Sequence, residues 1–305
     1  MSTIGIDIGG SKALAVRLDD GALVEERHTA TQRGPLIDTA LAAIRGVWNN
    51  DVDAVGVGIA GLVHWPEGVF AWGPHVEGTD VPLKALLEEE LDVPVAVDND
   101  ANVAAFGERV AGAARGFNDF LLVTLGTGIG GAIMIDGSVY RGESFAGEWG
   151  HIRHDPAGLL CDCGKRGCWE TVASGPALVR LAREVIGLNP DGSLAGRFGS
   201  TTITGENVTA AADAGDEVAR GLVAEVGSEL GRGLANLVAI FDPELVVVCG
   251  GLGSVGESLL GPARRVAAEA LHGGNHRLLP PILVAGAGPR AGAIGAAYLA
   301  SSIRS

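Results

Sequence analysis

The sequence has 305 residues, of which 47% are hydrophobic and 19% charged, which allows two domains with sizeable cores and argues against a disordered chain. Its formal net charge of −15 argues against nucleic-acid or anionic-membrane binding, because few cations are available to neutralise phosphates. No basic leader opens the chain and no apolar run reaches membrane-spanning length, so we expect a cytoplasmic protein.

The first half of the chain alternates strand and helix patterns. Residues 4–21 (IGIDIGGSKALAVRLDDG) have the pattern of a strand, a glycine turn, a second strand and a closing Asp-Gly turn. The elements expected after this hairpin are a helix at 35–48, a strand at 53–60, a helix at 82–91, a strand at 94–97 and a helix at 100–111. Residues 121–137 (LLVTLGTGIGGAIMIDG) then repeat the hairpin pattern, which indicates two related α/β domains.

The second half is richer in helices. Its expected elements are helices near 175–187, 206–214, 216–240, 256–271 and 291–303, with strands at 244–249 and 282–285. Residues 188–204 are expected to form a mobile loop. We expect the terminal helix to fold back on the first domain, which gives a small domain of 1–115 plus 291–305 and a large domain of 116–290.

Three glycine clusters predict a nucleotide site. Each places backbone N–H groups where they can approach phosphate oxygens, although a single cluster could also be a plain turn. The first also offers a carboxylate for Mg²⁺, a hydroxyl and an ammonium group, and the third follows an apolar strand, as a ribose and base site would. Their candidate ATP-binding residues are Asp7, Gly9, Gly10, Ser11 and Lys12; Gly126, Thr127, Gly128, Gly130 and Gly131; and Gly250 and Gly251.

The segment VDNDAN (residues 97–102) carries a candidate general base. Asp100 lies between an expected strand and an expected helix, so it could be a simple N-cap or a carboxylate that accepts the proton of a substrate hydroxyl. Asn99 beside it offers both a donor and an acceptor to an alcohol-rich ligand.

The segment GEWGHIRHDPAGLLCDCGKRGCWE (residues 147–170) predicts a structural zinc site. Cys161, Cys163 and Cys168 with an upstream histidine give the Cys₃His set of closed tetrahedral sites, and spacing alone leaves both His151 and His154 open. Glu148 and Glu170 bracket the metal loop; they could be plain surface charges, or a rigid metal loop could aim them at sugar hydroxyls. Cys249 stands apart and is expected to be a buried thiol.

Together these motifs resemble those of the ROK family of sugar kinases. DIGGSK, NDAN, GTGIGG, GEWGH and CDCGKRGCWE occur in the family's order and spacing over essentially the whole chain. The resemblance implies a two-domain actin-like, ribonuclease H-like α/β fold with an interdomain cleft, and a homodimer. It further implies Asp100 as general base, His151 as the zinc ligand that also contacts sugar, and Gly61, Asn99, Glu148 and Glu170 as sugar-binding residues.

One departure from the family concerns the hexose. Where many family glucokinases have Asn, this chain has His75, and Gly78-Thr79-Asp80 replaces the usual downstream Trp. We expect ATP-dependent phosphorylation of glucose at its 6-hydroxyl. N-acetylglucosamine, N-acetylmannosamine, mannose and fructose are the alternative acceptors, and polyphosphate is an alternative donor. A sugar-responsive repressor or sensor is disfavoured, because no helix-turn-helix segment precedes the first glycine loop.

Overall fold

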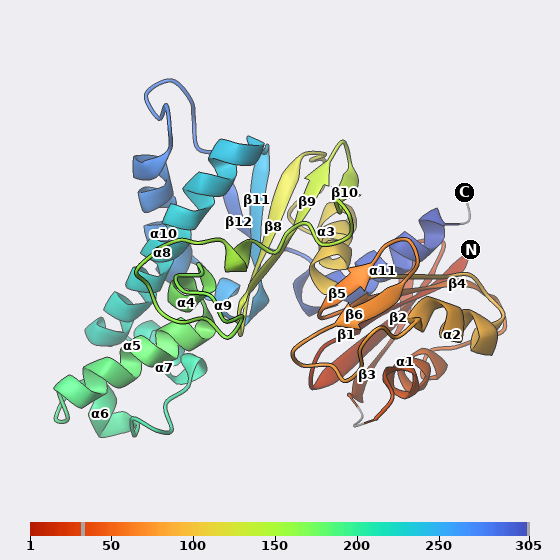
Figure 1. The fold of residues 1–305 in the computed structure, drawn as a ribbon, viewed down its shortest axis with the longest axis horizontal. Helices are drawn as coiled ribbons and strands as arrows, with labels where there is room; N and C mark the ends of the chain where they lie inside the picture. Colours follow the sequence, from red (N-terminus) through yellow and green to blue (C-terminus); the bar gives the residue numbers. More distant parts are fainter. Residues whose placement is uncertain (32–33, 304–305) are drawn as a thin grey trace. The chain divides into compact units, whose positions relative to one another are not determined.

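A computed structural model describes residues 1–31 and 34–303 (Figure 1). Its contacts divide the chain into two compact units. Unit 1 comprises Met1–Leu122, Ala132–Gly147 and Gly286–Ser305, and unit 2 comprises Val123–Gly131 and Glu148–Ala285. The segment 132–147 therefore belongs to unit 1, where the sequence led us to expect one continuous large domain from residue 116 to residue 290.

Unit 1 is built on a five-stranded sheet of order β3-β2-β1-β4-β7. Its strands are β1 (Ser2–Ile8), β2 (Lys12–Asp19), β3 (Ala22–Ala30), β4 (Val52–Ile59) and β7 (Val95–Asn99), and a small second sheet pairs β5 (Leu62–His64) with β6 (Val69–Trp72). β1, β4 and β7 are parallel, and the β1–β2–β3 meander is antiparallel. β3 was not predicted, because this edge strand is almost wholly exposed and lacks the alternation that reveals a half-buried strand.

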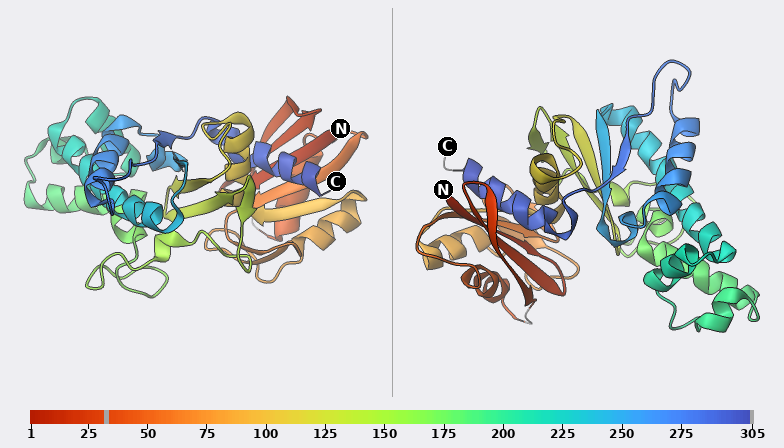
Figure 2. Two further views of the ribbon diagram at one scale, coloured as in Figure 1. Left: turned by 90° about the horizontal axis from the view of Figure 1, so that it is seen from above. Right: turned by 180° about the vertical axis from the view of Figure 1, so that it is seen from behind.

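Helices cover both faces of this sheet. On one face, α1 (Leu36–Arg45) and α2 (Leu83–Leu91) pack on the Ile and Val side chains of β1, β4 and β7. On the other face lie α3 (Asp100–Ala111) and α11 (Ala291–Ser302), which follows a short 3₁₀ turn η2 (Gly288–Arg290). Figures 1 and 2 show α11, the terminal helix, lying along the unit 1 sheet although its residues are the last in the chain.

Glycines permit the close approach of α11 to the sheet. A Cβ on Gly5 would lie 1.9 Å from the carbonyl oxygen of Ala293, and one on Gly56 would lie 1.8 Å from that of Ala296. Larger side chains at these two positions would push the helix away from the strands. In β1 and β4, glycine on the α11 face alternates with isoleucine and valine on the opposite face. The packing of α11 requires this pattern.

Unit 2 contains most of the helices. They are α4 (Glu170–Ala173), α5 (Gly175–Leu188), α6 (Ser193–Arg197), α7 (Gly205–Asp213), α8 (Glu217–Phe241), α9 (Gly250–Gly253) and α10 (Glu257–Ala270), with a 3₁₀ turn η1 (Trp149–His151). α8 and α10 pack closely, because Gly227 and Gly231 face the carbonyl groups of Leu259 and Ala263. The expected loop at 188–204 contains α6, which buries Leu194.

A second five-stranded sheet has the order β10-β9-β8-β11-β12. Its strands are β8 (Phe120–Leu125), β9 (Ile129–Ile135), β10 (Ser138–Tyr140), β11 (Leu245–Cys249) and β12 (Ile282–Val284). The division between the units falls within β8 and β9. Among the described residues, no helix combines the length and hydrophobicity that crossing a bilayer requires.

The glycine-dependent packing of α11 can be tested by substitution. We expect Gly56→Ala to lower the free energy of unfolding by at least about 2 kcal/mol, because the added methyl group overlaps the Ala296 carbonyl. The control is Gly221→Ala, which lies on the exposed side of α8 with no neighbouring atom within 4 Å of the added Cβ, and which should stabilise by about 0.5–1 kcal/mol. Urea denaturation of both variants measures the difference, and equal stabilities would contradict this account.

Candidate functional site

The candidate functional residues of unit 1 lie at the carboxyl ends of its parallel strands. The strand register aligns Asp7 of β1 with Gly58 of β4 and Asp98 of β7, and the next row aligns Ile8, Ile59 and Asn99. β1 and β4 then enter turns and β7 leads directly into the helix α3, all at the same edge of the sheet, where polar groups gather in open α/β sheets.

The first glycine loop forms the tight turn between β1 and β2. The amide of Gly9 donates to the carbonyl of Lys12 at 3.0 Å, and the hydroxyl of Thr31 donates to the carbonyl of Gly9 at 2.7 Å. Ser11 and Lys12 are exposed. His75 packs on this loop, since a Cβ on Gly10 would lie 2.6 Å from the Cβ of His75. His75 therefore lies beside a predicted phosphate-binding turn.

Asp7 at the end of β1 has an altered protonation equilibrium. The pKa of Asp7 is raised to about 7, mainly by burial and in part by the charge of Asp100, while Lys12 opposes the shift. The helix α11 contributes to this burial, because a Cβ on Gly292 would lie 2.4 Å from Oδ2 of Asp7. A carboxylate poised near neutrality can bind a cation with release of a proton.

Asn99 and Asp100 occupy the junction of β7 and α3. Asn99 is the N-cap of α3, and its side chain accepts from the amides of Ala101 at 2.8 Å and Asn102 at 3.3 Å. Asp100 is the first helical residue, so the simple N-cap interpretation applies to Asn99 and not to Asp100. The side-chain nitrogen Nδ2 of Asn99 also donates to the carbonyl of Gly61 at 3.0 Å. Gly61 has a φ of +148° and sits against the backbone of Trp72, which excludes a side chain there.

The second glycine loop, in unit 2, contacts residues of the cysteine-rich segment (residues 147–170). The amide of Ile129 donates to Oε2 of Glu170 at 3.4 Å, and a Cβ on Gly128 would lie 2.6 Å from the same oxygen. Gly131 packs on the indole of Trp149, whose nitrogen donates to the carbonyl of Gly130 at 3.0 Å. A candidate sugar-binding glutamate and a candidate phosphate-binding loop are thus in direct contact.

The third cluster follows β11, as predicted. Gly250 has a φ of +86° and approaches the backbone of Leu125 on β8 too closely for a side chain, while Gly251 faces open space at the start of α9. Cys249, expected to be buried, is only half-buried, because it is the last residue of its strand and lies at the sheet edge.

Four residues converge on one candidate metal site. The ligand atoms of His151, Cys161, Cys163 and Cys168 all lie within 4.8 Å of one another. Nδ1 of His151 is 3.7 Å from Sγ of Cys161, and Sγ of Cys163 is 3.5 Å from that of Cys168. A tetrahedral zinc site with normal bond lengths has edges of about 3.5–3.8 Å, so the donor set fits. Burial raises the pKa of Cys161 and Cys168, and a backbone amide at Lys165 lowers that of Cys163.

His154, which spacing left open as a ligand, has a different partner. Its Nε2 lies 2.9 Å from a carboxylate oxygen of Glu229 on α8. The neighbouring Trp169 is fully buried, and its indole nitrogen donates to the carbonyl of Glu229 at 3.0 Å. These contacts fasten the cysteine-rich segment to the longest helix of unit 2, which holds the sulfur ligands in place.

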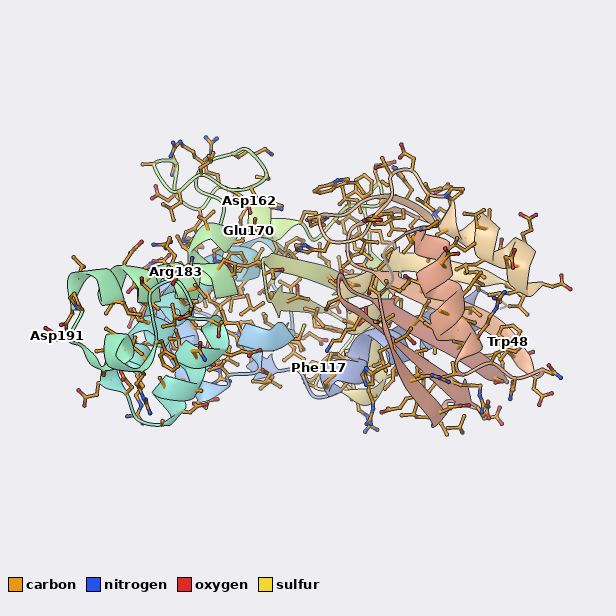
Figure 3. The ribbon with its side chains drawn as sticks, turned by 90° about the horizontal axis from the view of Figure 1, so that it is seen from below. Trp48, Phe117, Asp162, Glu170, Arg183 and Asp191 are labelled. Atoms are coloured by element: carbon orange, nitrogen blue, oxygen red, sulfur yellow. The ribbon has the colours of Figure 1, made fainter. Side chains whose placement is uncertain are left out.

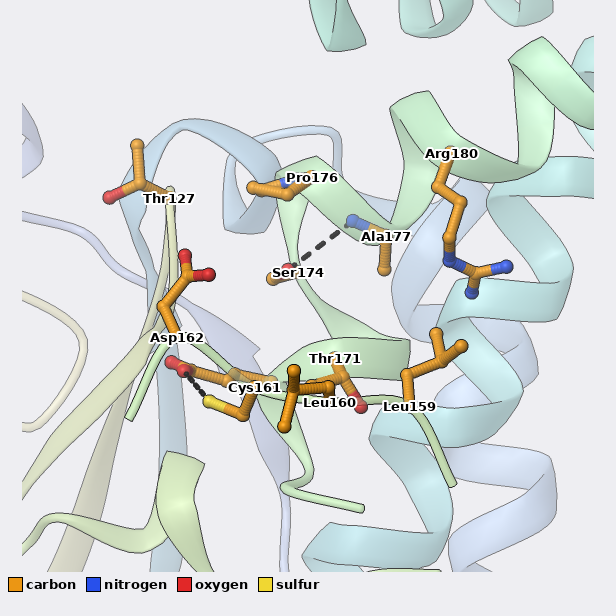
Figure 4. Close-up of a pocket in the computed structure, with 11 residues that line it drawn as sticks. Thr127, Leu159, Leu160, Cys161, Asp162, Thr171, Ser174, Pro176, Ala177 and Arg180 are labelled. Carbon is orange, nitrogen blue, oxygen red and sulfur yellow. Dashed lines mark hydrogen bonds between the residues drawn. The ribbon is translucent and has the colours of Figure 1, made fainter. Parts of the chain in front are cut away.

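A pocket of about 210 Å³ adjoins the cysteine-rich segment. Figure 4 shows Thr127 of the second glycine loop and Arg180 of α5 on opposite sides of it, with Leu160 and Cys161 along a third side. Asp162 and Glu170 also line it and lie near one another in Figure 3. Desolvation raises the pKa of nearby Glu148, an effect that His151 opposes and the charge of Glu170 increases. Polar groups for binding an oxygen-rich ligand are therefore present in unit 2.

A set of largely buried residues next to Asn99 was not predicted from the sequence. Asp98, Asn102 and Arg141 are joined by hydrogen bonds, and Trp65 covers the guanidinium group of Arg141. Asp98 adjoins a recognised motif, but nothing in the local pattern indicates that its partner lies 43 residues further along the chain. Glu108 was also missed; its fully buried carboxylate accepts from the amides of Ala113, Gly286 and Ala287.

Comparisons with known proteins match the chain over nearly its full length. The family model described as "ROK family" matches residues 3–303. The glucokinase of Streptomyces coelicolor is 38% identical over 307 residues, which cover 98% of this chain and 97% of that protein. The N-acetylmannosamine kinase of Citrobacter koseri is 34% identical over 277 residues, covering 88% and 89%.

The solved structures agree with the sequence comparisons. A ROK family glucokinase from Streptomyces griseus, in complex with glucose and AMPPNP, is 40% identical and superimposes with a TM-score of 0.88, covering 99% of this chain and all of that one. This likeness confirms the expected fold class.

The raised pKa of Asp7 makes stability depend on pH. The pKa is about 7 in the folded chain and about 4 in the unfolded chain, so the folded state binds more protons between these values. Stability should therefore fall as the pH rises from about 4 to 7 in protein free of metal and nucleotide. Asp7→Asn should remove most of this decrease, with a gain over the wild type on the order of 1 to 4 kcal/mol at pH 8. Urea denaturation at a series of pH values measures it, and parallel profiles would contradict the assignment.

Proposed function

Since the chain belongs to the ROK family, as its motifs predicted, we propose that it is an ATP-dependent hexose kinase that phosphorylates glucose at the 6-hydroxyl. The observation that carries this proposal is the full-length likeness to a glucokinase whose structure holds glucose and a nucleotide. The two glycine loops and the Asn99–Asp100 pair at the β7 edge support it, because phosphoryl transfer requires these groups in defined places.

We assign the binding of ATP, the phosphoryl donor, to residues of the glycine loops. Asp7, Ser11 and Lys12 of unit 1 and residues 126–131 of unit 2 would hold the phosphates of ATP, and Gly250 and Gly251 would lie against the ribose and base. Asp7 is the candidate Mg²⁺ ligand, and its pKa of about 7 means that metal binding at neutral pH displaces a proton. When bound, Mg²⁺ would neutralise charge on the phosphates.

The groups proposed to bind the sugar include a candidate general base. Asp100 would take the proton of the 6-hydroxyl as that oxygen attacks the γ-phosphorus in line, and the bond to the β-phosphate oxygen breaks. Asn99, Gly61 and His75 of unit 1 would orient the sugar. Glu148, His151 and Glu170 of unit 2 would bind its hydroxyls, with Nε2 of His151 as the donor if Nδ1 faces a metal.

We propose a structural Zn²⁺ at the Cys₃His set. The donor chemistry and the spacing support zinc, and four protein ligands leave no open position for catalysis. The metal would fix the segment between Glu148 and Glu170. We also propose that the protein forms a homodimer, as the family resemblance implies.

Other hexoses are the second candidate acceptors. The likeness to an N-acetylmannosamine kinase supports amino sugars as alternatives, and His75 in place of the usual Asn changes a candidate sugar-binding residue. Mannose and fructose belong to the same test, as does polyphosphate as donor. A regulator without kinase activity is the remaining alternative.

A coupled ADP-release assay over a panel of hexoses and amino sugars tests this function. We expect glucose to give the highest kcat/KM. Asp100→Asn should lower kcat at least about 100-fold while glucose binding, measured by calorimetry, changes little, because the carboxylate is needed only to accept the proton. Absence of ADP release with every sugar, and of sugar phosphate with polyphosphate, would refute the kinase; comparable activity in Asp100→Asn would refute the general base.

The proposed zinc can be tested independently of turnover. Elemental analysis should find about one zinc per chain, and Cys163→Ser should weaken zinc retention against a chelator at least about tenfold. Cys249→Ser, which alters a thiol outside the set, should retain zinc like the wild type. Loss of zinc should raise the sugar KM or lower the Tm. A zinc-free protein with unchanged KM and Tm would contradict the structural assignment.

A further inference from the structure

A buried ion pair lies directly below the candidate sugar-binding edge of unit 1. Oδ2 of Asp98 accepts from Nε of Arg141 at 2.8 Å, and Nη2 of Arg141 is 2.7 Å from the same oxygen. The Asp98 side chain is 2% exposed and that of Arg141 is 13% exposed. A charge this deeply buried is tolerated only with close partners, and removal of one partner leaves the other uncompensated.

The second carboxylate oxygen of Asp98 faces the residues that bind or react. Oδ1 accepts from the backbone amide of Asn99 at 2.8 Å and from the side-chain amide of Asn102 at 2.8 Å. Asn102 lies in the first turn of α3, one turn from Asn99 and two residues after Asp100. Asp98 therefore orients the peptide that joins the strand to the helix, and with it the directions of the Asn99 and Asp100 side chains.

Arg141 is itself held from a third direction. Its guanidinium carbon lies 4.0 Å from the centroid of the Trp65 ring, a cation–π arrangement. The amide of Trp65 donates to the hydroxyl of Ser144 at 3.1 Å, and Ser144 is a buried residue with a φ of +113°. A serine rarely adopts this conformation, so the contact with Trp65 maintains a locally costly backbone.

These contacts close a ring around the sheet edge. Trp65 directly follows β5, which begins one residue after Gly61, and the carbonyl of Gly61 accepts from the side chain of Asn99. The ring thus runs from Asp98 to Arg141, to Trp65, along β5 to Gly61, and back to Asn99. The segment that carries Arg141 and Ser144 also leads along the chain to Glu148.

We propose that Arg141 is a positioning residue for the kinase reaction, which acts through Asp98 on Asn99 and Asp100 and through Trp65 on the Gly61 turn. This inference rests on the proposed function. A lysine at 141 would keep the positive charge but lose the planar, two-nitrogen contact with Asp98 and the stacking on Trp65. The expected consequence is misdirection of the general base, while the ATP-binding loops are untouched.

The experiment compares Arg141→Lys with Arg17→Lys. Arg17 on β2 is a matched control: its side chain is 14% exposed and pairs with Asp19 and Glu25 in the same unit, away from the sheet edge that carries Asn99. We expect Arg141→Lys to lower kcat about 10- to 100-fold with the KM for ATP within about twofold of the wild type. Arg17→Lys should keep kcat within about twofold. An unchanged kcat in Arg141→Lys at a lowered Tm, or an equal loss in Arg17→Lys, would overturn the proposal.

A second readout does not depend on turnover. Hydrogen exchange followed by mass spectrometry should show faster exchange in Arg141→Lys at peptides covering 99–102 and 61–65, with the β1–β2 hairpin unchanged. Exchange rates at these peptides equal to those of the wild type would overturn the positioning role, even if the kinase assay failed for every sugar. If Arg141→Lys does not fold, Trp65→Phe replaces it, because it keeps an aromatic face and the ion pair; it should lower kcat about 3-fold or more, and an unchanged kcat would overturn the proposal.

Discussion

The parallel register of β1, β4 and β7 is the constraint on which the unit 1 site depends. Hydrogen bonding between these strands places Asp7 and Asp98 in one row, and Asn99 in the next. Because side chains alternate along a strand, a slip of one residue would turn each carboxylate to the opposite face. The Ile and Val side chains on the α1–α2 face prevent that slip, since it would move them to the face that α11 approaches too closely for side chains and would bury the carboxylates on the α1–α2 face.

The other face of the same sheet links packing to chemistry. Glycines in β1 and β4 let α11 approach the strands, and Gly292 brings this helix against Asp7. The resulting loss of water is the main reason why the pKa of Asp7 rises to about 7. A helix from the end of the chain therefore contributes to the raised pKa of a residue near its start. The small residue at position 292 therefore affects the surroundings of Asp7 as well as the packing of α11.

In unit 2, rigidity comes from aromatic anchors around a thiol cluster. Trp149 packs on Gly131 of the second glycine loop, and Trp169 packs on Gly233 of α8. Glu170 follows Trp169 directly and contacts both the glycine loop and Sγ of Cys161. The candidate phosphate loop, sugar ligand and metal ligands thus share one set of supports, so a disturbance of the thiols should be felt at the loop.

The sequence by itself determined the features that depend on local spacing. The glycine loops, the Asn99–Asp100 pair and the three clustered cysteines were recognisable because each occupies a short segment whose residue types carry the chemistry, and their order identified the family. The main helices and buried strands followed from periodicity, whereas exposed β3 and short α6 did not, because neither has an apolar stripe long enough to detect.

Only the tertiary structure decided which distant groups act on these motifs. Spacing left His151 and His154 equivalent, and the family resemblance favoured His151. The fold brings His151 to the thiols, whereas His154 pairs with Glu229, on a helix far along the chain. The Arg141–Asp98 pair and the raised pKa of Asp7 have the same origin. Burial and ion pairing are properties of the surroundings in space, and for these residues the surroundings come from remote segments of the chain.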